Sequence, residues 1–262
     1  MLVDSHCHLD FPELAGEVDA ILAAMRENGV THALCVSVTL EDFPRVRALA
    51  ERYPQLYASV GVHPDYPDVP EVTVEELERL AAHPRVIAIG ETGLDYLRIK
   101  GDCEWQRERF RRHIQAARAC GKPLIVHMRE AAADTLAIMR AEGADRVGGV
   151  MHCFTETWEV AQAAMDLGFH ISFSGIVTFK NARALKEVAQ RVPLERMLIE
   201  TDSPYLAPVP FRGKTNQPAL VKHVAEEIAR LQGQSVEQVG HVTSGNFFRL
   251  FGLADRERRD AN

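Results

Sequence analysis

The sequence has no long apolar run and none of the common organic-cofactor motifs. No stretch approaches the ~18 consecutive apolar residues that a transmembrane helix needs, and the first residues lack the basic start and apolar segment of a signal peptide. Neither a GxGxxG turn nor a GxxxxGKS/T loop occurs, so no dinucleotide or nucleoside triphosphate site is indicated. We therefore expect a soluble, cytoplasmic protein with no membrane partner and no organic cofactor.

Cysteine and positive charge are both in short supply. Five cysteines are present without a CxxC pair, which indicates reduced thiols in a cytosolic protein rather than a disulfide framework. Lys and Arg total 30 against 37 Asp and Glu, and the formal net charge is −7. This balance argues against a broad basic face that coats long nucleic acid, although it is compatible with a local basic mouth.

Short apolar runs alternate with amphipathic stretches along the 262 residues. Runs rich in Val, Ile and Leu that alternate with helices are typical of a parallel sheet covered by helices. Eight such units predict an α/β fold, a single-domain (β/α)8 TIM barrel over residues 1–254, followed by a charged C-terminal tail at 255–262. An open doubly wound sheet is the alternative, but no glycine-rich turn follows the first strand.

Glycines mark the ends of several expected helices. Gly29, Gly121, Gly143 and Gly168 each follow a helical stretch, where a left-handed residue commonly closes a helix. The expected strands are 2–5, 33–38, 56–62, 86–90, 123–126, 149–151, 170–174 and 197–201. The expected helices are 18–27, 43–51, 74–82, 105–119, 131–141, 158–167, 182–190 and 219–231, with two short closing helices at 235–239 and 244–251.

Side chains able to bind metals end six of the eight expected strands. His6 and His8 lie two residues apart on the first strand, so both imidazoles face the same side. Later strands end in His63, Glu91, His127, His152 and Asp202. Because the catalytic groups of such barrels lie at the C-terminal ends of the strands, we expect a metal site at this mouth.

The number of these ligands indicates a chemistry. Even without His63, the four other histidines and two carboxylates exceed the needs of one tetrahedral ion, so two divalent ions that share a carboxylate are the simplest account. Glu91, midway around the barrel, is the natural bridge. Two ions ~3.5–4 Å apart can hold a hydroxide, polarise a phosphoryl or carbonyl oxygen and stabilise the leaving oxygen. The sequence therefore predicts hydrolysis of esters or amides.

The remaining histidines have simpler interpretations. His32, His83 and His170 are expected at the far end of the barrel. His113, His223 and His241 are expected on the surface or at helix ends. Cys7 and Cys153 alternate with ligand residues, so we expect them to point away from the site and to pack.

Eight motifs follow one another along almost the whole chain: DSHCHLD at 4–10, GVHP at 61–64, GETGLDY at 90–96, VH at 126–127, MHCF at 151–154, SGIVTFKN at 174–181, ETDSPYL at 200–206 and NFFRLFG at 246–252. With these motifs the chain resembles the TatD-like metal-dependent deoxyribonucleases, a branch of the amidohydrolase-type barrel hydrolases. The resemblance implies that two divalent cations, Mg²⁺ or Mn²⁺ with Zn²⁺ as the alternative, are bound by His6, His8, Glu91, His127, His152 and Asp202. The chain departs from the family at Phe211 and Gln217, where histidine and glutamate are expected, and this departure concerns substrate preference.

The catalytic residues are expected to be Asp202, Glu91 and His63. Asp202 is placed to bind an ion and to accept a proton from the attacking water. His63 and Asp95 are expected to orient ligands or the water from behind. Glu200, one layer deeper than Asp202, is expected to pair with a cation inside the barrel.

The residues expected to bind substrate are Arg129, Asp95, Tyr96 and Arg212. The planar fork of Arg129 suits a phosphate oxygen, although a surface salt bridge with Glu130 or Asp134 is the alternative. Further cations are expected to form a basic mouth: Arg98, Lys100, Arg107, Arg109 and Lys214. For Arg107 and Arg109, a solvated helix face is the alternative. Tyr96, Phe154 and Tyr205 are expected to stack on bases or to form an apolar lid.

Three functions remain open at this point. The first is a phosphodiesterase that acts on DNA at strand ends or on single strands, and we expect it to be a monomer. The second is a hydrolase of small esters, lactones or amides, or of aminoacyl-tRNA, on the same metals. The third, a non-enzymatic metal-binding protein, is disfavoured because the ligands lie at an open barrel mouth rather than in a closed structural site.

Overall fold

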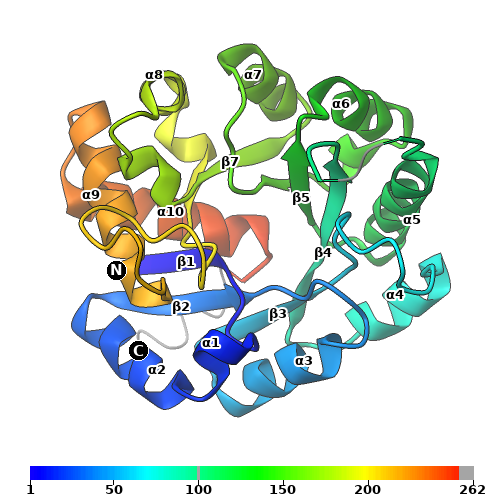
Figure 1. Ribbon diagram of the computed structural model, residues 1–262, viewed down its shortest axis with the longest axis horizontal. Coiled ribbons are helices and arrows are strands. Elements are labelled where there is room, and N and C mark those ends of the chain that lie inside the picture. Colours follow the sequence, from blue (N-terminus) through cyan, green and yellow to red (C-terminus); the bar gives the residue numbers. More distant parts are fainter. Residues whose placement is uncertain (99–100, 254–262) are drawn as a thin grey trace.

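The chain forms a barrel of parallel strands surrounded by helices, as predicted (Figure 1). The computed structural model describes residues 1–98 and 101–253. Its eight strands pair in the order in which they occur in the chain, from β1 to β8, and each neighbouring pair is parallel. Lys100 and the expected tail at 255–262 lie outside the described residues. The described residues include no helix long and apolar enough to cross a membrane.

The observed elements agree with the expected ones to within a few residues at most ends. The strands are β1 Leu2–Cys7, β2 Val30–Cys35, β3 Leu56–Val60, β4 Val86–Asp95, β5 Leu124–Arg129, β6 Gly149–Met151, β7 Phe169–Phe173 and β8 Met197–Ile199. The helices are α1 Pro12–Ala15, α2 Val18–Glu27, α3 Phe43–Arg52, α4 Val74–Ala81, α5 Glu104–Cys120, α6 Ala132–Ala141, α7 Trp158–Asp166, α8 Arg183–Arg191, α9 Val221–Gln232 and α10 Val236–Leu250. Short 3-10 turns are η1 Ala144–Arg146, η2 Gly175–Thr178, η3 Leu194–Arg196 and η4 Pro218–Leu220.

The prediction of two short helices at the end of the chain is wrong, because α10 runs without a break from Val236 to Leu250. Gly240 lies in its middle, where a Cβ would come within 2.5 Å of the carbonyl oxygen of Met1. Glycine therefore allows the helix to pack closely against the start of β1 and does not interrupt it. Ser235 begins the helix and accepts a hydrogen bond from the backbone N–H of Gln238, a typical N-cap.

The first and last strands close the barrel beside the expected metal site. Cys7 and Ser203 form a parallel bridge beyond the end of β8. The backbone N–H of Asp202 donates to the carbonyl oxygen of His6 at 2.9 Å, and the N–H of His8 donates to that of Ser203, also at 2.9 Å. Closure thus brings residues almost 200 positions apart in sequence to the same mouth.

Candidate metal centre

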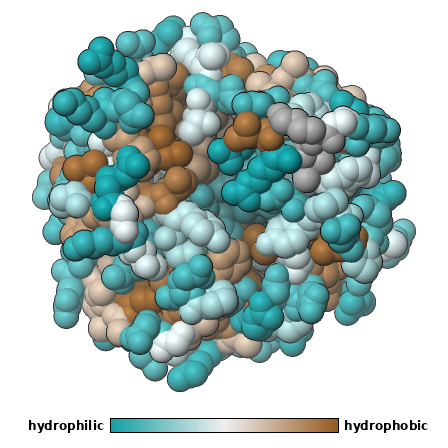
Figure 2. All heavy atoms as spheres, in the orientation of Figure 1, coloured by the Kyte–Doolittle hydropathy of each residue, from teal (hydrophilic) through white to brown (hydrophobic). Residues whose placement is uncertain are grey.

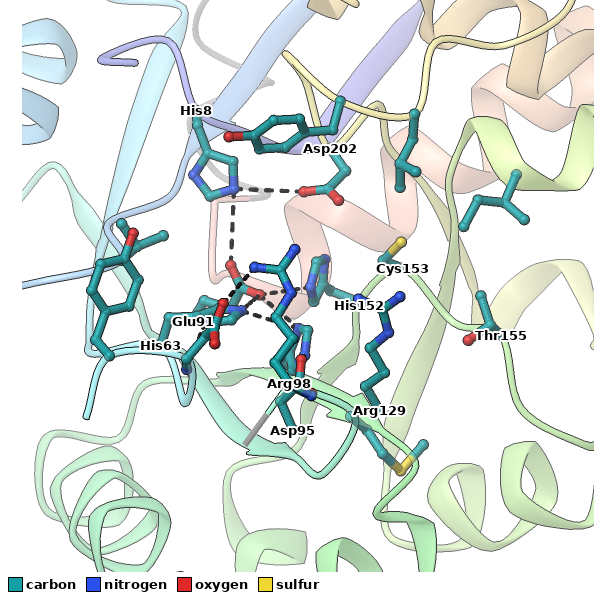
Figure 3. A pocket seen from close by; sticks show the side chains of 18 of the residues that line it. His8, His63, Glu91, Asp95, Arg98, Arg129, His152, Cys153, Thr155 and Asp202 are labelled. Carbon is teal, nitrogen blue, oxygen red and sulfur yellow. Dashed lines mark hydrogen bonds and ion pairs between the residues drawn. The ribbon is translucent and has the colours of Figure 1, made fainter. Parts of the chain in front are cut away.

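The ligand-type side chains at the strand ends come together around one cavity of about 330 Å³. Figure 2 shows this mouth as a hollow near the middle of the face. In Figure 3, His8, Glu91 and Asp202 face one another across it, with His63 and His152 beside Glu91. The residues expected to bind metal are therefore neighbours, as the strand-end pattern predicted.

Glu91, on β4, lies at the centre of the cluster and is only 2% exposed. Its Oε1 atom is 2.8 Å from Nε2 of His152, 3.1 Å from Nδ1 of His127 and 3.2 Å from Nε2 of His63. Its Oε2 atom is 3.2 Å from Nε2 of His6 and 3.9 Å from Nε2 of His8. The two oxygens of one carboxylate thus face two different groups of imidazoles.

Asp202 completes the group that contains His6 and His8. Its Oδ1 atom is 3.7 Å from Nε2 of His6 and 3.5 Å from Nε2 of His8, and these two nitrogens are 3.3 Å apart. Asp202 has a φ of 55°, a left-handed conformation that Asp tolerates better than most residues. Its backbone bond to His6 holds it in this conformation, so the side chain points toward the two imidazoles.

Three of the imidazoles are oriented by acceptors on their outer side. Nδ1 of His8 lies 3.0 Å from the carbonyl oxygen of Val36 and Nε2 of His127 lies 3.1 Å from Oδ2 of Asp95. Nδ1 of His152 lies 3.1 Å from Oε1 of Glu200. Because a carbonyl or ionised carboxylate can only accept, each outer nitrogen carries the proton in the neutral ring and the inner nitrogen presents a lone pair.

Inward-facing lone pairs beside carboxylate oxygens are the arrangement that a cation requires. Nε2 of His152 is buried and makes no hydrogen bond, although it lies close to Glu91. Ligand atoms come within 4.8 Å of one another in three groups, namely His6–His152–Asp202, His6–His8–Glu91 and His63–Glu91–His127. The donor set of imidazole nitrogens and carboxylate oxygens fits divalent metal ions.

When the imidazoles carry a second proton on the inner nitrogen, in the position that a bound cation would take, the electrostatics keep both carboxylates of the cluster ionised. Burial alone would raise the pKa of Glu91, but the nearby charges of His152, His63 and His6 outweigh it and hold this pKa well below its ordinary value. Burial likewise opposes ionisation of Asp202, and the hydrogen bond from His8 with the charge of His152 reverses the effect, so that its pKa is lowered. Ionised carboxylates are the form that binds metals.

Two predicted orienting residues differ in where they lie. Asp95 is behind His127, as expected, and it also accepts the backbone N–H groups of Leu97 at 3.0 Å and Arg98 at 2.9 Å. His63 instead lies among the ligand-type atoms, because it approaches Oε1 of Glu91 directly. Glu200, expected to pair with a cation inside the barrel, accepts hydrogen bonds from His152 at 3.1 Å and from the backbone N–H of Cys153 at 2.7 Å, so its partner there is an imidazole.

His113 was expected at the surface, and that expectation is also wrong. It is fully buried on α5, where Nδ1 lies 2.8 Å from the carbonyl oxygen of Arg109 and Nε2 accepts the backbone N–H of Val62 at 3.0 Å. Burial lowers the pKa of this imidazole to about 4. Because Val62 precedes His63, this contact fixes the end of the segment that carries a ligand-type side chain.

The expected substrate-binding residues are only partly brought together. Arg129 and Asp95 line the cavity, and Arg129 forms no ion pair with any described residue. Tyr96 is not among the residues that line it; its hydroxyl donates to Asp134 at 2.7 Å, on the side of α5 and α6. Arg212 lines a second, neighbouring cavity and stacks on the ring of Phe179.

Only some of the other residues predicted at the mouth line the metal cavity. Arg98 and Tyr205 line the metal cavity, whereas Arg109 is 1% exposed and pairs with Glu71 at 2.7 Å. Residues that the sequence did not assign to the site also line it, among them Phe11, Asp65, Tyr66, Thr155, Ile176 and Leu206, and so does Cys153, whose expected orientation away from the site is wrong. Most of these lie on loops beyond strand ends, and that position is the one signal in the sequence that could have found them.

Comparisons with known proteins agree with this site. The profile of the family described as TatD related DNase matches residues 3–252. The chain is 52% identical over 255 residues to YcfH of Escherichia coli strain K12, an uncharacterized metal-dependent hydrolase, with 96% of each chain covered. It is 33% identical over 260 residues to a protein of Edwardsiella piscicida named 3'-5' ssDNA/RNA exonuclease TatD, with 97% of this chain and 100% of the other covered.

The fold comparison gives the same result. The crystal structure of YJJV, a TatD homolog from Escherichia coli K12, matches with a TM-score of 0.89 at 29% identity, over 96% of this chain and 98% of that one. The profile match extends over nearly the whole described barrel, so it includes every ligand-type residue of the cluster. The chain belongs to the TatD related DNase family and is a metal-dependent hydrolase.

Proposed function

We propose that this hydrolase cleaves phosphodiester bonds of single-stranded DNA from a strand end, with two divalent cations. The observation that carries the proposal is the position of Glu91, whose two oxygens face separate groups of imidazoles. A carboxylate in that position is suited to bridge two ions. The printed name of the Edwardsiella piscicida relative, a 3'-5' ssDNA/RNA exonuclease, supports the choice of substrate.

The residues divide into two ligand groups. His6, His8 and Asp202 would hold one cation with Oε2 of Glu91, while His127 and His152 would hold the other with Oε1. His63 is close enough to Oε1 to steady the bridge or to contact the second ion. Divalent cations bound there, Mg²⁺ or Mn²⁺ with Zn²⁺ as the alternative, lower the pKa of water and offset charge on a phosphoryl oxygen.

The chain's own groups supply the proton transfer and the grip on substrate. Asp202 is ionised and its side chain is 16% exposed at the cavity, so it can accept a proton from the attacking water. Arg129 and Arg98 enter the cavity from the side of β4 and β5, where their planar groups suit phosphate oxygens (Figure 3). Arg98 is also held by Asp65, whereas Arg129 is left available.

The size of the cavity favours an end over the middle of a duplex. A volume of about 330 Å³ is in the range of small-ligand pockets, so it accommodates a terminal nucleotide. The net charge of −7 leaves little general attraction for a long polyanion. Substrate binding would then depend on the cations and on a few arginines near the mouth.

The proposal is tested with metal-depleted protein that is reloaded with Mg²⁺, Mn²⁺ or Zn²⁺. Labelled single-stranded DNA, blunt duplex, a lactone panel and charged tRNA are offered in parallel, with Asp202→Asn as the matched control. We expect shortening of the single strand from one end, abolished by chelation and strongly reduced in the variant. Hydrolysis of the lactones or of charged tRNA without shortening of DNA would instead favour the alternative ester substrates.

A further inference from the structure

The cations on two sides of the barrel differ in whether they are paired. Those on the α5 side are neutralised: Arg107 pairs with Glu104 and Asp134, each at 3.1 Å, and Arg112 pairs with Glu71 at 2.9 Å. Arg111 on the same helix pairs with Glu104 at 2.9 Å. On another side of the barrel, Lys180, Arg212 and Arg183, the last at the start of α8, form no ion pair with any described residue.

These three unpaired cations line one shallow, open surface cavity of about 590 Å³ together with Asn181 and Val209, and none of the described residues that line it is acidic. The guanidinium of Arg212 lies 3.6 Å from the centre of the Phe179 ring. Stacking on a ring face orients a guanidinium while leaving its edge N–H groups free for an anion. In a chain with a net charge of −7, such a group of unopposed cations has no evident role in stability.

This second cavity is joined to the metal cavity by two loops. Ile176 and Leu206 line the metal cavity, and the same two segments continue to Lys180 and to Val209 in the second cavity. The backbone N–H of Val209 donates to Oγ1 of Thr178 at 2.9 Å, which ties one loop to the other. A Cβ at Gly175 would come within 2.0 Å of the carbonyl oxygen of Leu206, so glycine allows the loops to approach closely.

We infer that Lys180, Arg183 and Arg212 form a second subsite, which binds a backbone phosphate of a single-stranded polynucleotide whose end lies in the metal cavity. Proteins that hold single strands combine basic grooves with exposed aromatic side chains. Tyr205, at the rim of the metal cavity, is 52% exposed and is suitably placed for such a contact. This inference rests on the proposed function, and it makes the substrate an oligonucleotide rather than a mononucleotide ester.

The test compares two triple variants that remove the same charge. K180Q/R183Q/R212Q removes the unpaired cations, and R107Q/R111Q/R112Q removes three paired ones from α5. Binding of a short fluorescent single-stranded oligonucleotide is measured by anisotropy at several salt concentrations in the Asp202→Asn background, with metal present. Turnover of thymidine 5'-(p-nitrophenyl phosphate), which has a single phosphodiester, is measured in the otherwise unchanged protein.

We expect the K180Q/R183Q/R212Q variant to bind the oligonucleotide about ten-fold more weakly, as expected when charge-assisted bonds are removed. The slope of log affinity against log salt should become shallower by ~0.7 for each phosphate that the variant no longer neutralises. Turnover of the small ester should fall far less than oligonucleotide affinity, because the three residues line the second cavity and not the metal cavity, and the α5 variant should bind like the parent. Equal weakening by both triple variants, or by neither, would overturn the subsite.

These measurements distinguish failure of the second subsite from failure of the proposed reaction. If the parent protein does not shorten DNA but the unpaired-cation variant still loses oligonucleotide affinity and salt dependence, the subsite stands and the proposed reaction falls. If DNA is shortened and neither binding nor its salt slope depends on the unpaired cations, the subsite falls and the reaction stands.

Discussion

At the N-terminal ends of the strands the barrel interior is apolar and covered by a helix, whereas at the C-terminal ends it is polar and opens into a cavity. The apolar end contains Val3, Leu34, Tyr57, Ile87, Ile125, Val150 and Leu198, packed with Phe247, Phe248 and Phe251. The open end contains the histidines and carboxylates around Glu91. The same strands thus stabilise the fold at one end and position reactive groups at the other, the division typical of this barrel.

Strand β1 passes from one end to the other and changes its alternation on the way. Val3 packs in the inner cluster, but Cys7, four residues later, packs in the outer core between strands and helices. A register shift relative to β2 occurs between Asp4 and Cys7. The irregularity turns His6 and His8 toward the mouth while leaving Val3 in the sealed end, and regular alternation alone would not permit both.

Replacing Glu91 with glutamine should have the largest effect, and it should be confined to the open end. The amide keeps the shape but is a poor bridging ligand, so we expect turnover to fall by more than the ~10–100-fold typical of losing a partner that only orients a ligand. Elemental analysis should show less bound metal. The control is Glu187→Gln, at an exposed position of α8, and this variant should keep its bound metal and its activity. Normal turnover of the Glu91→Gln variant with full metal content would contradict a metal-binding role for the Glu91 carboxylate.

Replacing Phe247 with alanine should do the reverse, because this residue is fully buried in the sealed end. Loss of a buried phenylalanine typically costs about 3–5 kcal/mol of unfolding free energy. Urea denaturation should detect this cost, while turnover per folded molecule at low temperature stays the same. Phe247→Leu should cost less. A large loss of turnover in folded Phe247→Ala would show that the two ends are not independent.

The contact between α5 and the end of β3 should appear as a pH-dependent stability. The pKa of buried His113 is about 4 in the folded chain against an ordinary 6.5, so the unfolded chain binds more protons between these values. The stabilisation is complete above pH 6.5 and is lost as pH falls toward 4, by about 3 kcal/mol in total. Urea melts across this range should show the loss. His113→Gln, which retains a donor and an acceptor, should flatten this dependence; an unchanged slope would rule out this origin.

Replacing Asp95 with asparagine should have the smallest effect of the four, because its contact with the ligand-type cluster is made through His127. Loss of such an orienting partner typically lowers metal affinity 10–100-fold. Competition with a chelator measures this affinity directly, and excess metal should restore most of the turnover. If turnover is not restored at any metal concentration, Asp95 itself contacts substrate or water.

The sequence predicted the barrel and most of the ligand cluster because both depend on local patterns. Apolar runs mark strands, and a histidine or carboxylate at a strand end is visible without knowing the partner strand. Pairings between distant elements were not predictable. Arg109 looks like a cation on an amphipathic helix, yet it is buried against the carbonyl oxygens of His63 and Tyr66, a contact set by how α5 packs beside β4 and α4. His113 was misplaced for the same reason.

The proposed site depends on whether the carboxylate of Glu91 bridges two divalent cations. Anomalous diffraction from crystals of the protein loaded with Mn²⁺ observes such a bridge directly. We expect two peaks on either side of the Glu91 carboxylate, one beside His6, His8 and Asp202 and the other beside His127 and His152. A single peak at full occupancy, or peaks that leave Glu91 without contact to either ion, would contradict the bridging role.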